Sequence, residues 1–133
     1  MTKWNLHSQI KGALRRVMSR SPMVKECREQ SVHPINKGPR GGKQFVCVAC
    51  GECFSGNNIQ IDHINPVVPV DKSLQEMTWT QLVKRMFCST NNLQVLCLDC
   101  HKLKTKQERE LRKEHKKRAK DLINLKSKKG TGD

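Results

Sequence analysis

The sequence predicts a small α+β protein in which a β-hairpin and a helix surround bound metal, with basic helical extensions at both ends. Its 133 residues suffice for about one domain. Only 35% of them are apolar, with three Phe, two Trp and no Tyr, which is little for the hydrophobic core of a domain this size. Two Cys-x2-Cys pairs offer a metal site that would stabilise the fold in addition to the core.

Residues 1–43 are predicted to form a basic helical extension and a linker. Apolar residues at helical spacing predict an amphipathic helix over about residues 8–20. Ser21 followed by Pro22 is typical of a helix cap and a first helical position, so a second short helix begins there. Residues 33–43 contain two Pro and three Gly without periodicity, and we expect a loop or linker.

Residues 44–106 are predicted to be the folded centre. The apolar-rich stretches at 45–47 and 59–63 flank the turn-forming sequence Ser-Gly-Asn-Asn at 55–58, which predicts a β-hairpin. Two successive capping-box spacings, Ser73 with Glu76 and Thr78 with Gln81, accompany an apolar pattern and predict a helix over about residues 74–87.

The end of the chain is predicted to be helical and largely solvated. A short apolar run at 93–96 precedes the second Cys pair. After Cys100 the composition favours helix, but the leucines are too sparse for one continuous buried stripe. We expect the first turns to pack, and residues 107–133 to form a basic helical or frayed tail.

The charge is concentrated in the two flanking segments. The formal net charge is +14, with ten basic and two acidic residues in 1–43 and thirteen and four in 102–129. Residues 44–101 carry only three basic and five acidic residues. Basic flanks around a metal-rich centre predict a polyanionic partner held by its backbone. The alternative is that the flanks only maintain solubility or bind nucleic acid without further purpose.

The sequence shows no targeting or membrane signal. The N-terminus lacks an apolar run of signal-peptide length, and no stretch approaches 18 consecutive apolar residues. We therefore expect a soluble cytoplasmic protein in a reducing compartment, with no membrane partner.

Four cysteines form the predicted structural zinc site. Cys47 with Cys50, and Cys97 with Cys100, have the spacing of two zinc knuckles that share one tetrahedral ion. The 46 residues between the pairs would make the ion close a large loop. Cys53 is an alternative to Cys50, although its spacing does not match the second pair, and disulfide bonding is the alternative to metal. The remaining thiols, Cys27 and Cys88, are expected to be small buried apolar residues.

A second candidate metal site lies beside the first in the predicted fold. Asp62 and His63 end a predicted strand, and His101 directly follows the last cysteine. Zinc binding would draw these residues together into an open site of oxygen and nitrogen ligands. The alternative is that both histidines are packed structural residues.

Three stretches of this sequence carry a family resemblance. FVCVAC, IDHINPV and NNLQVLCLDCHKLKT closely resemble the HNH endonucleases, especially the small phage-type members with a two-knuckle zinc site. The resemblance covers residues 44 to about 106. It implies a ββα-metal, treble-clef-like fold, in which a hairpin and one helix surround a catalytic ion.

The resemblance also implies the roles of individual residues. His63 is the general base, and Asp62 with His101 holds the catalytic divalent ion. Asn92 corresponds to the asparagine of the HNH motif and steadies the loop beneath His63, and Asn91 is the alternative residue for this role. Some relatives have a further histidine where this chain has Thr105, which weakens the expected metal affinity in the absence of DNA.

The chemistry of these residues agrees with phosphodiester hydrolysis. A neutral imidazole can take a proton from water near neutral pH. Two protein ligands leave most coordination positions free, which favours Mg²⁺ or Mn²⁺ over tightly held Zn²⁺. Three lysines on the helix after His101 are candidates for phosphate contacts, with a solvated face as the alternative: Lys102, Lys104 and Lys106.

The sequence therefore predicts a metal-dependent endonuclease that nicks or cuts double-stranded DNA. By resemblance the protein is expected to be phage-encoded and to act in an infected bacterial cell, with an unknown partner in packaging or replication. A non-catalytic zinc-bound DNA-binding module and an RNA- or ribosome-associated zinc protein are the alternatives.

Overall fold

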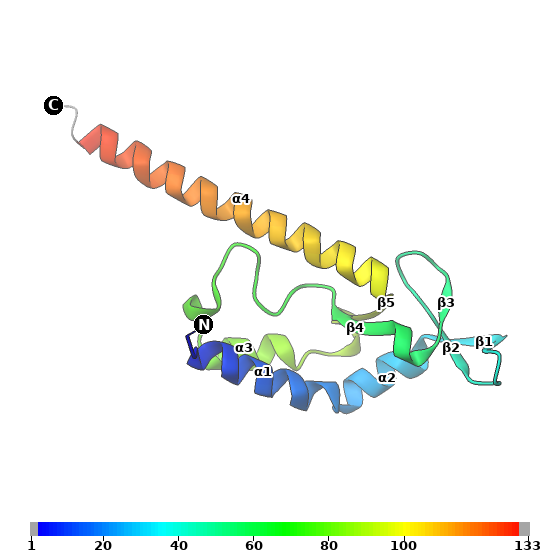
Figure 1. The fold of residues 1–133 in the computed structure, drawn as a ribbon. Coiled ribbons are helices and arrows are strands. Elements are labelled where there is room, and N and C mark those ends of the chain that lie inside the picture. Colours follow the sequence, from blue (N-terminus) through cyan, green and yellow to red (C-terminus); the bar gives the residue numbers. More distant parts are fainter. Residues whose placement is uncertain (1–2, 131–133) are drawn as a thin grey trace.

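The computed structural model describes residues 3–130, with side chains up to residue 126. Helices and strands follow one another along this part of the chain in the order α1 (Leu6–Ser19), α2 (Pro22–Gln30), β1 (Val32–Lys37), β2 (Lys43–Val46), β3 (Cys53–Phe54), β4 (Ile59–His63), α3 (Trp79–Met86), β5 (Leu93–Cys97) and α4 (Leu98–Gly130). Figure 1 shows α1 and α2 on one side of β4 and β5, and α4 on the other. This confirms the predicted small α+β class.

The strands form two antiparallel sheets, which corrects the predicted hairpin. β2 lies between β1 and β3 in one sheet, whereas β4 pairs with β5 in the other. The β4–β5 register runs from Ile59 opposite Cys97 to His63 opposite Leu93. The prediction that residues 45–47 pair with 59–63 is wrong because each stretch pairs with a different strand. β2 pairs with β3, whereas β4 pairs with β5, whose residues lie 30 to 38 positions further along the chain.

The loop predicted at residues 33–43 is mostly strand. β1 pairs with β2, so only the turn at 38–42 remains irregular. Pro34 has no N–H to donate, but β1 is an edge strand, where a missing donor is tolerated. The last four residues of β1 are all exposed, so the strand lacks the alternating apolar pattern by which a sequence reveals one.

The first two helices belong to the main hydrophobic core. The predicted second helix is confirmed, with Pro22 at its start and the Ser21 hydroxyl accepting a hydrogen bond from the Val24 N–H. Met18 and Val24 are buried in one cluster with residues of α3 and β5. The core therefore continues across the boundary predicted at residue 44.

The helix predicted at 74–87 is divided in two. A short 3-10 turn at Leu74–Glu76 is followed by α3, and each begins with its own capping box. Ser73 pairs with Glu76 in the first, and Thr78 with Gln81 in the second. Both capping signals are thus used, and they mark two starts in place of one.

The chain after Cys100 is helical as far as Gly130, as predicted, but more of this helix packs than its first turns. α4 begins at Leu98, so Cys100 and His101 lie in its first turns. Its side chains are partly buried at intervals as far as His115, whereas every side chain from 116 to 126 is exposed. The far end of the predicted tail, residues 131–133, lies outside the described residues. Over the part of the chain that the structure describes, no helix combines the length and apolar character needed to cross a membrane.

Two arginines hold the segment between β4 and α3. Arg112 of α4 donates from Nη2 to the Val68 carbonyl at 2.6 Å and from Nη1 to the Pro69 carbonyl at 3.0 Å. Arg85 of α3 donates to the Pro66 and Val67 carbonyls at 2.7 and 2.8 Å. This segment directly follows the Asp62-His63 pair, so α4 stabilises the fold as far along as Arg112.

We predict that Arg112→Ala lowers the free energy of unfolding by about 2 kcal/mol, because two to three charge-assisted hydrogen bonds to carbonyls are removed. Chemical denaturation monitored by circular dichroism measures the change. Arg118→Ala is the matched control on the same helix, since Arg118 pairs with Glu114 on the exposed surface. That control should change stability by roughly 0.5 kcal/mol or less. Equal effects of the two substitutions would contradict the anchoring role of Arg112.

Candidate functional site

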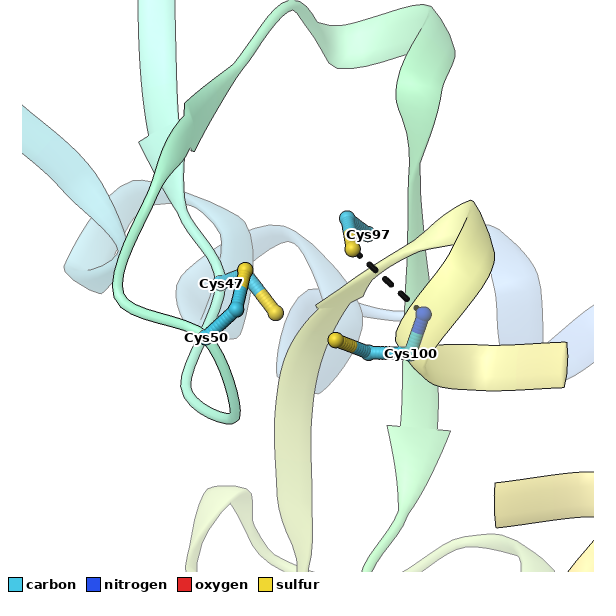
Figure 2. A group of neighbouring side chains, drawn as sticks. All are labelled: Cys47, Cys50, Cys97 and Cys100. Atoms are coloured by element: carbon cyan, nitrogen blue, oxygen red, sulfur yellow. Dashed lines mark hydrogen bonds between the residues drawn. The ribbon is translucent and has the colours of Figure 1, made fainter. Parts of the chain in front are cut away.

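Four cysteines from two distant segments converge at one point (Figure 2). Cys47 directly follows β2 and Cys50 lies in the turn after it, whereas Cys97 ends β5 and Cys100 lies in the first turn of α4. Their sulfur atoms all lie within 4.8 Å of one another. Sulfurs bound to one tetrahedral zinc at about 2.3 Å would lie about 3.8 Å apart, so a small contraction would close the site.

The backbone around the first pair has the shape of a metal knuckle. The Gly51 N–H donates to the Cys47 carbonyl at 2.8 Å, and Gly51 has a φ of 75°, a left-handed conformation that favours glycine. Cys47 is fully buried and Cys97 is 4% exposed, and both pack against Leu96. The cluster is therefore a second, smaller core built around thiols.

The ionisation of these thiols is interdependent. Burial raises the pKa of Cys47, but hydrogen bonds from backbone N–H groups and from the Cys50 thiol outweigh it and lower that pKa to about 6. The hydrogen bond with Cys97, burial and the other nearby thiols raise the pKa of Cys100 to about 12. Four thiolates so close together require a cation, and a sulfur-only tetrahedral set suits zinc. The predicted cysteines can thus hold a metal ion such as zinc.

The other three cysteines stand apart from this group. Cys53 lies in β3, where its sulfur accepts a hydrogen bond of 3.6 Å from the Asn36 amide, and it is not among the four clustered thiols. Cys27 is buried in the main core, and Cys88 packs against that core. Burial and then the neighbouring Cys88 raise the pKa of the Cys27 thiol, as expected for a packing residue.

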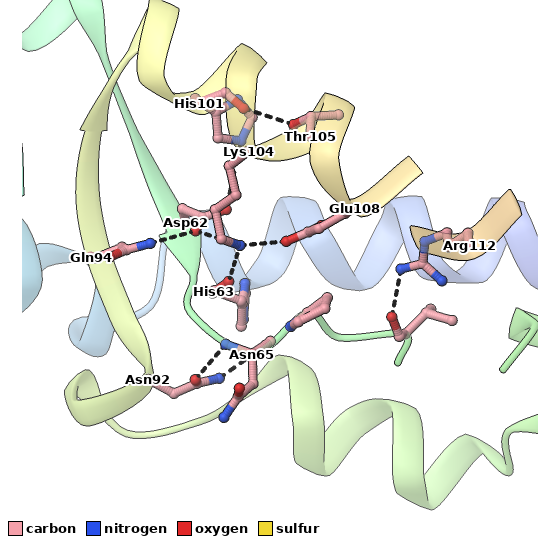
Figure 3. Close-up of polar contacts among 12 residues, drawn as sticks. Asp62, His63, Asn65, Asn92, Gln94, His101, Lys104, Thr105, Glu108 and Arg112 are labelled. Atoms are coloured by element: carbon pink, nitrogen blue, oxygen red, sulfur yellow. Dashed lines mark hydrogen bonds and ion pairs between the residues drawn. The ribbon is translucent and has the colours of Figure 1, made fainter. Parts of the chain in front are cut away.

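The structure brings together the three residues predicted to form the second site (Figure 3). Asp62 and His63 end β4, and α4 places His101 above them. The His101 Nε2 lies 3.8 Å from the Asp62 Oδ1. Two atoms bound to one ion at about 2.1 Å can lie at most about 4.2 Å apart, so this pair fits a shared divalent ion.

The Asp62 carboxylate has partners that the sequence did not reveal. Its Oδ2 accepts a hydrogen bond from the Gln94 amide at 3.0 Å and forms an ion pair with the Lys104 ammonium at 2.9 Å. Lys104 also pairs with Glu108 and donates to the His63 carbonyl at 3.0 Å. One signal was available: residues 101, 104, 105 and 108 share one face of a helix.

The His63 ring is fixed by a backbone carbonyl. Its Nε2 lies 2.8 Å from the carbonyl oxygen of Met86 at the end of α3. A carbonyl oxygen only accepts, so Nε2 carries the proton, and in the neutral ring Nδ1 then holds the lone pair. The sequence gives no sign of this partner, because Met86 contributes through its backbone.

Asn92 holds the loop that follows His63. Its side-chain Oδ1 accepts from the Asn65 N–H at 2.9 Å, its Nδ2 donates to the Asn65 carbonyl at 3.3 Å, and its own carbonyl accepts from the Ile64 N–H at 2.8 Å. Asn91, the alternative, is exposed. Asn92 therefore has the position of an orienting residue.

The three lysines predicted to bind phosphates have different surroundings. Lys104 points into the group formed by Asp62, His63, His101 and Glu108, which we call the Asp62 cluster, and its side chain is 23% exposed there (Figure 3). Lys102 and Lys106 are exposed on α4. The Thr105 hydroxyl donates to the His101 carbonyl one turn before it, at 2.9 Å. Of the three lysines, Lys104 alone reaches the cluster, and it does so as the partner of carboxylates.

Comparison with protein-family models, with curated proteins and with solved structures found no match to this chain. The chemistry of this protein is therefore inferred from the four clustered cysteines and from the group around Asp62, His63 and His101.

We predict that Cys97→Ser removes bound zinc and unfolds the centre of the protein, because opening a structural zinc site forfeits binding energy that is also folding energy. Elemental analysis of the purified protein and thermal unfolding measure the two effects. Cys53→Ser is the matched control and should keep one zinc per chain. A Cys97→Ser protein with full zinc content and an unchanged melting temperature would contradict the prediction. Loss of zinc from Cys53→Ser would instead show that Cys53, and not Cys50, is the fourth ligand.

Proposed function

We propose that this protein is a metal-dependent endonuclease that hydrolyses phosphodiester bonds of double-stranded DNA. The observation that carries the proposal is the arrangement of three side chains. Asp62 and His101 face one another at a separation that suits one divalent ion, and His63 stands beside them with its Nδ1 free to accept a proton. The order of β4, β5 and α4 around these residues supports a ββα-metal unit.

Each residue of the candidate site has its own role in the proposed reaction. Asp62 and His101 would hold Mg²⁺ or Mn²⁺, which supplies positive charge to the phosphate and to the departing oxygen. His63 takes a proton from water at Nδ1 while the water oxygen attacks phosphorus. The bond from phosphorus to the 3′ oxygen breaks, and that oxygen leaves with a proton from solvent. Asn92 and the Met86 carbonyl keep the imidazole in position throughout.

The cysteine cluster supports a structural role in this proposal. Four thiolates close the coordination of zinc and leave no position for water or phosphate. The second site has one carboxylate and one imidazole and remains open to both. Because Cys97, Cys100 and His101 lie within five consecutive residues, zinc at the first site fixes the helix that carries a ligand of the second.

One observation favours a non-catalytic DNA-binding module as the second candidate. Lys104 already supplies a positive charge to Asp62 and Glu108, so one of these two negative charges is balanced without a metal ion. In a binding module the cluster would be a structural ion-pair network. Metal-dependent cleavage separates the two candidates directly.

We predict that the purified protein converts supercoiled plasmid to relaxed or linear DNA in Mg²⁺ or Mn²⁺. EDTA should stop the reaction, and zinc content should be measured before and after EDTA, so that loss of the catalytic ion is distinguished from loss of structural zinc. Absence of cleavage in every divalent ion by zinc-loaded, folded protein would favour the binding module. Cleavage of RNA without cleavage of DNA would contradict the proposed substrate.

We predict that His63→Ala lowers the cleavage rate by about 10² to 10⁴, the usual contribution of a positioned acid or base. Plasmid nicking measures the rate, while zinc content and DNA affinity should remain those of the unaltered protein, because only the base is removed. His115→Ala is the control, since this partly buried histidine lies on α4 well beyond the site. An unchanged rate in His63→Ala would remove His63 from the mechanism.

A further inference from the structure

A cleft with basic walls leads to the Asp62 cluster. It has a volume of about 950 Å³ and lies between α1–α2 and α4. Asp62, His63 and His101 line it together with cationic side chains from both walls, namely Lys11, Arg15, Lys25 and Arg28 on α1–α2 and Arg109 and Arg112 on α4. We call this the helical cleft. Its walls come from the segments that the sequence presents as flanking extensions.

Two of these six cations make contacts that hold other parts of the protein in place. Arg112 donates to the carbonyls of the segment after β4, and the Arg28 guanidinium stacks 4.9 Å from the centre of the Phe45 ring. None of the ion pairs among the described residues involves the other four cations, which are Lys11, Arg15, Lys25 and Arg109.

Lys11 and Arg15 are unfavourably placed for stability alone. They lie one turn apart on α1, a spacing at which like charges repel and destabilise a helix. Burial, and then the nearby Arg15 and Arg112, lower the pKa of Lys11. Positive groups from α1 and α4 therefore lie close to one another in the cleft. An anion in the helical cleft would relieve the repulsion.

The cluster in the cleft indicates which anion this is. A nucleic-acid strand whose phosphate lies at Asp62 and His101 must place neighbouring phosphates against the cleft walls, because each strand of a duplex carries a phosphate about every 3.4 Å along the axis. Lys102 and Lys106 do not line the cleft, and Lys104 is engaged by carboxylates. The cations best placed to meet those phosphates are therefore Lys11, Arg15 and Lys25 on α1 and α2, with Arg109 on the α4 wall.

We propose that Lys11 and Arg15 of α1, with Lys25 of α2, bind the DNA phosphates adjacent to the one that is cleaved. This inference rests on the proposed endonuclease function and assigns α1 and α2 to substrate binding. Phosphate contacts of this kind fix the register of the protein on DNA without reading its sequence.

The test is the salt dependence of DNA binding, measured by fluorescence anisotropy with a short duplex. The protein carries its zinc but no added Mg²⁺ or Mn²⁺, so no cleavage is involved. The double variant Lys11→Gln with Arg15→Gln should bind more weakly and show a slope of log affinity against log salt shallower by about 1.8, or about 0.9 for each phosphate that is no longer neutralised. The matched control is Lys113→Gln with Lys117→Gln, which removes the same charge at the same helical spacing from exposed positions outside the cleft.

The outcomes separate this inference from the proposed function. A shallower slope in the cleft variant alone supports the inference even if the protein proves unable to cleave DNA. An unchanged slope, or an equal change in the control, would overturn it even if cleavage is confirmed. Arg15→Gln with Lys25→Gln, both exposed positions, replaces the first variant if Lys11→Gln impairs folding. A change seen with single-stranded RNA but not with duplex DNA would also overturn it.

Discussion

The pairing of β4 with β5 is the interaction on which both clusters depend. It joins residues 59–63 to residues 93–97 and leads without a break into α4. In this register Asp62 lies opposite Gln94, whose amide donates to its carboxylate. The same pairing fixes the place where α4 begins, and with it the positions of Cys100 and His101. A slip of one residue would turn Asp62 to the opposite face of the sheet and separate it from His101.

The helix-capping signals in the sequence were reliable, whereas the strand pairing inferred from the turn signal was wrong. Ser21 with Pro22, and Thr78 with Gln81, mark helix starts through hydrogen bonds to residues only three positions away. The partner of β4 could not be found in this way, because the turn-forming residues 55–58 suggested a nearby strand whereas the true partner lies beyond α3. The cysteine cluster was predictable despite its long loop, since two equal Cys-x2-Cys spacings already specify a shared tetrahedral ion.

The unpredicted parts of the candidate site share one physical origin. Met86 contributes a backbone carbonyl, and Lys104 reaches Asp62 only because α4 crosses β4. Neither contact leaves a trace in residue type or spacing near Asp62 and His63. The sequence could therefore name the residues with reactive side chains but not the groups that set the tautomer of His63 or the charge around Asp62.

The segment that carries the motifs shares its hydrophobic core with α1 and α2. Met18, Val24 and Cys27 fill the same buried cluster as Leu82, Met86 and Val95, while Arg112 holds the backbone that follows His63. Residues 44–106 alone would expose the apolar surface that α1 and α2 cover and would lack that anchor. The helices that complete the core also form a wall of the helical cleft, where the core residues Met18 and Val24 line the cleft beside Lys11, Arg15 and Lys25. α1 thus carries both Met18, which is buried in the core, and two cations, Lys11 and Arg15, that take part in none of the ion pairs among the described residues.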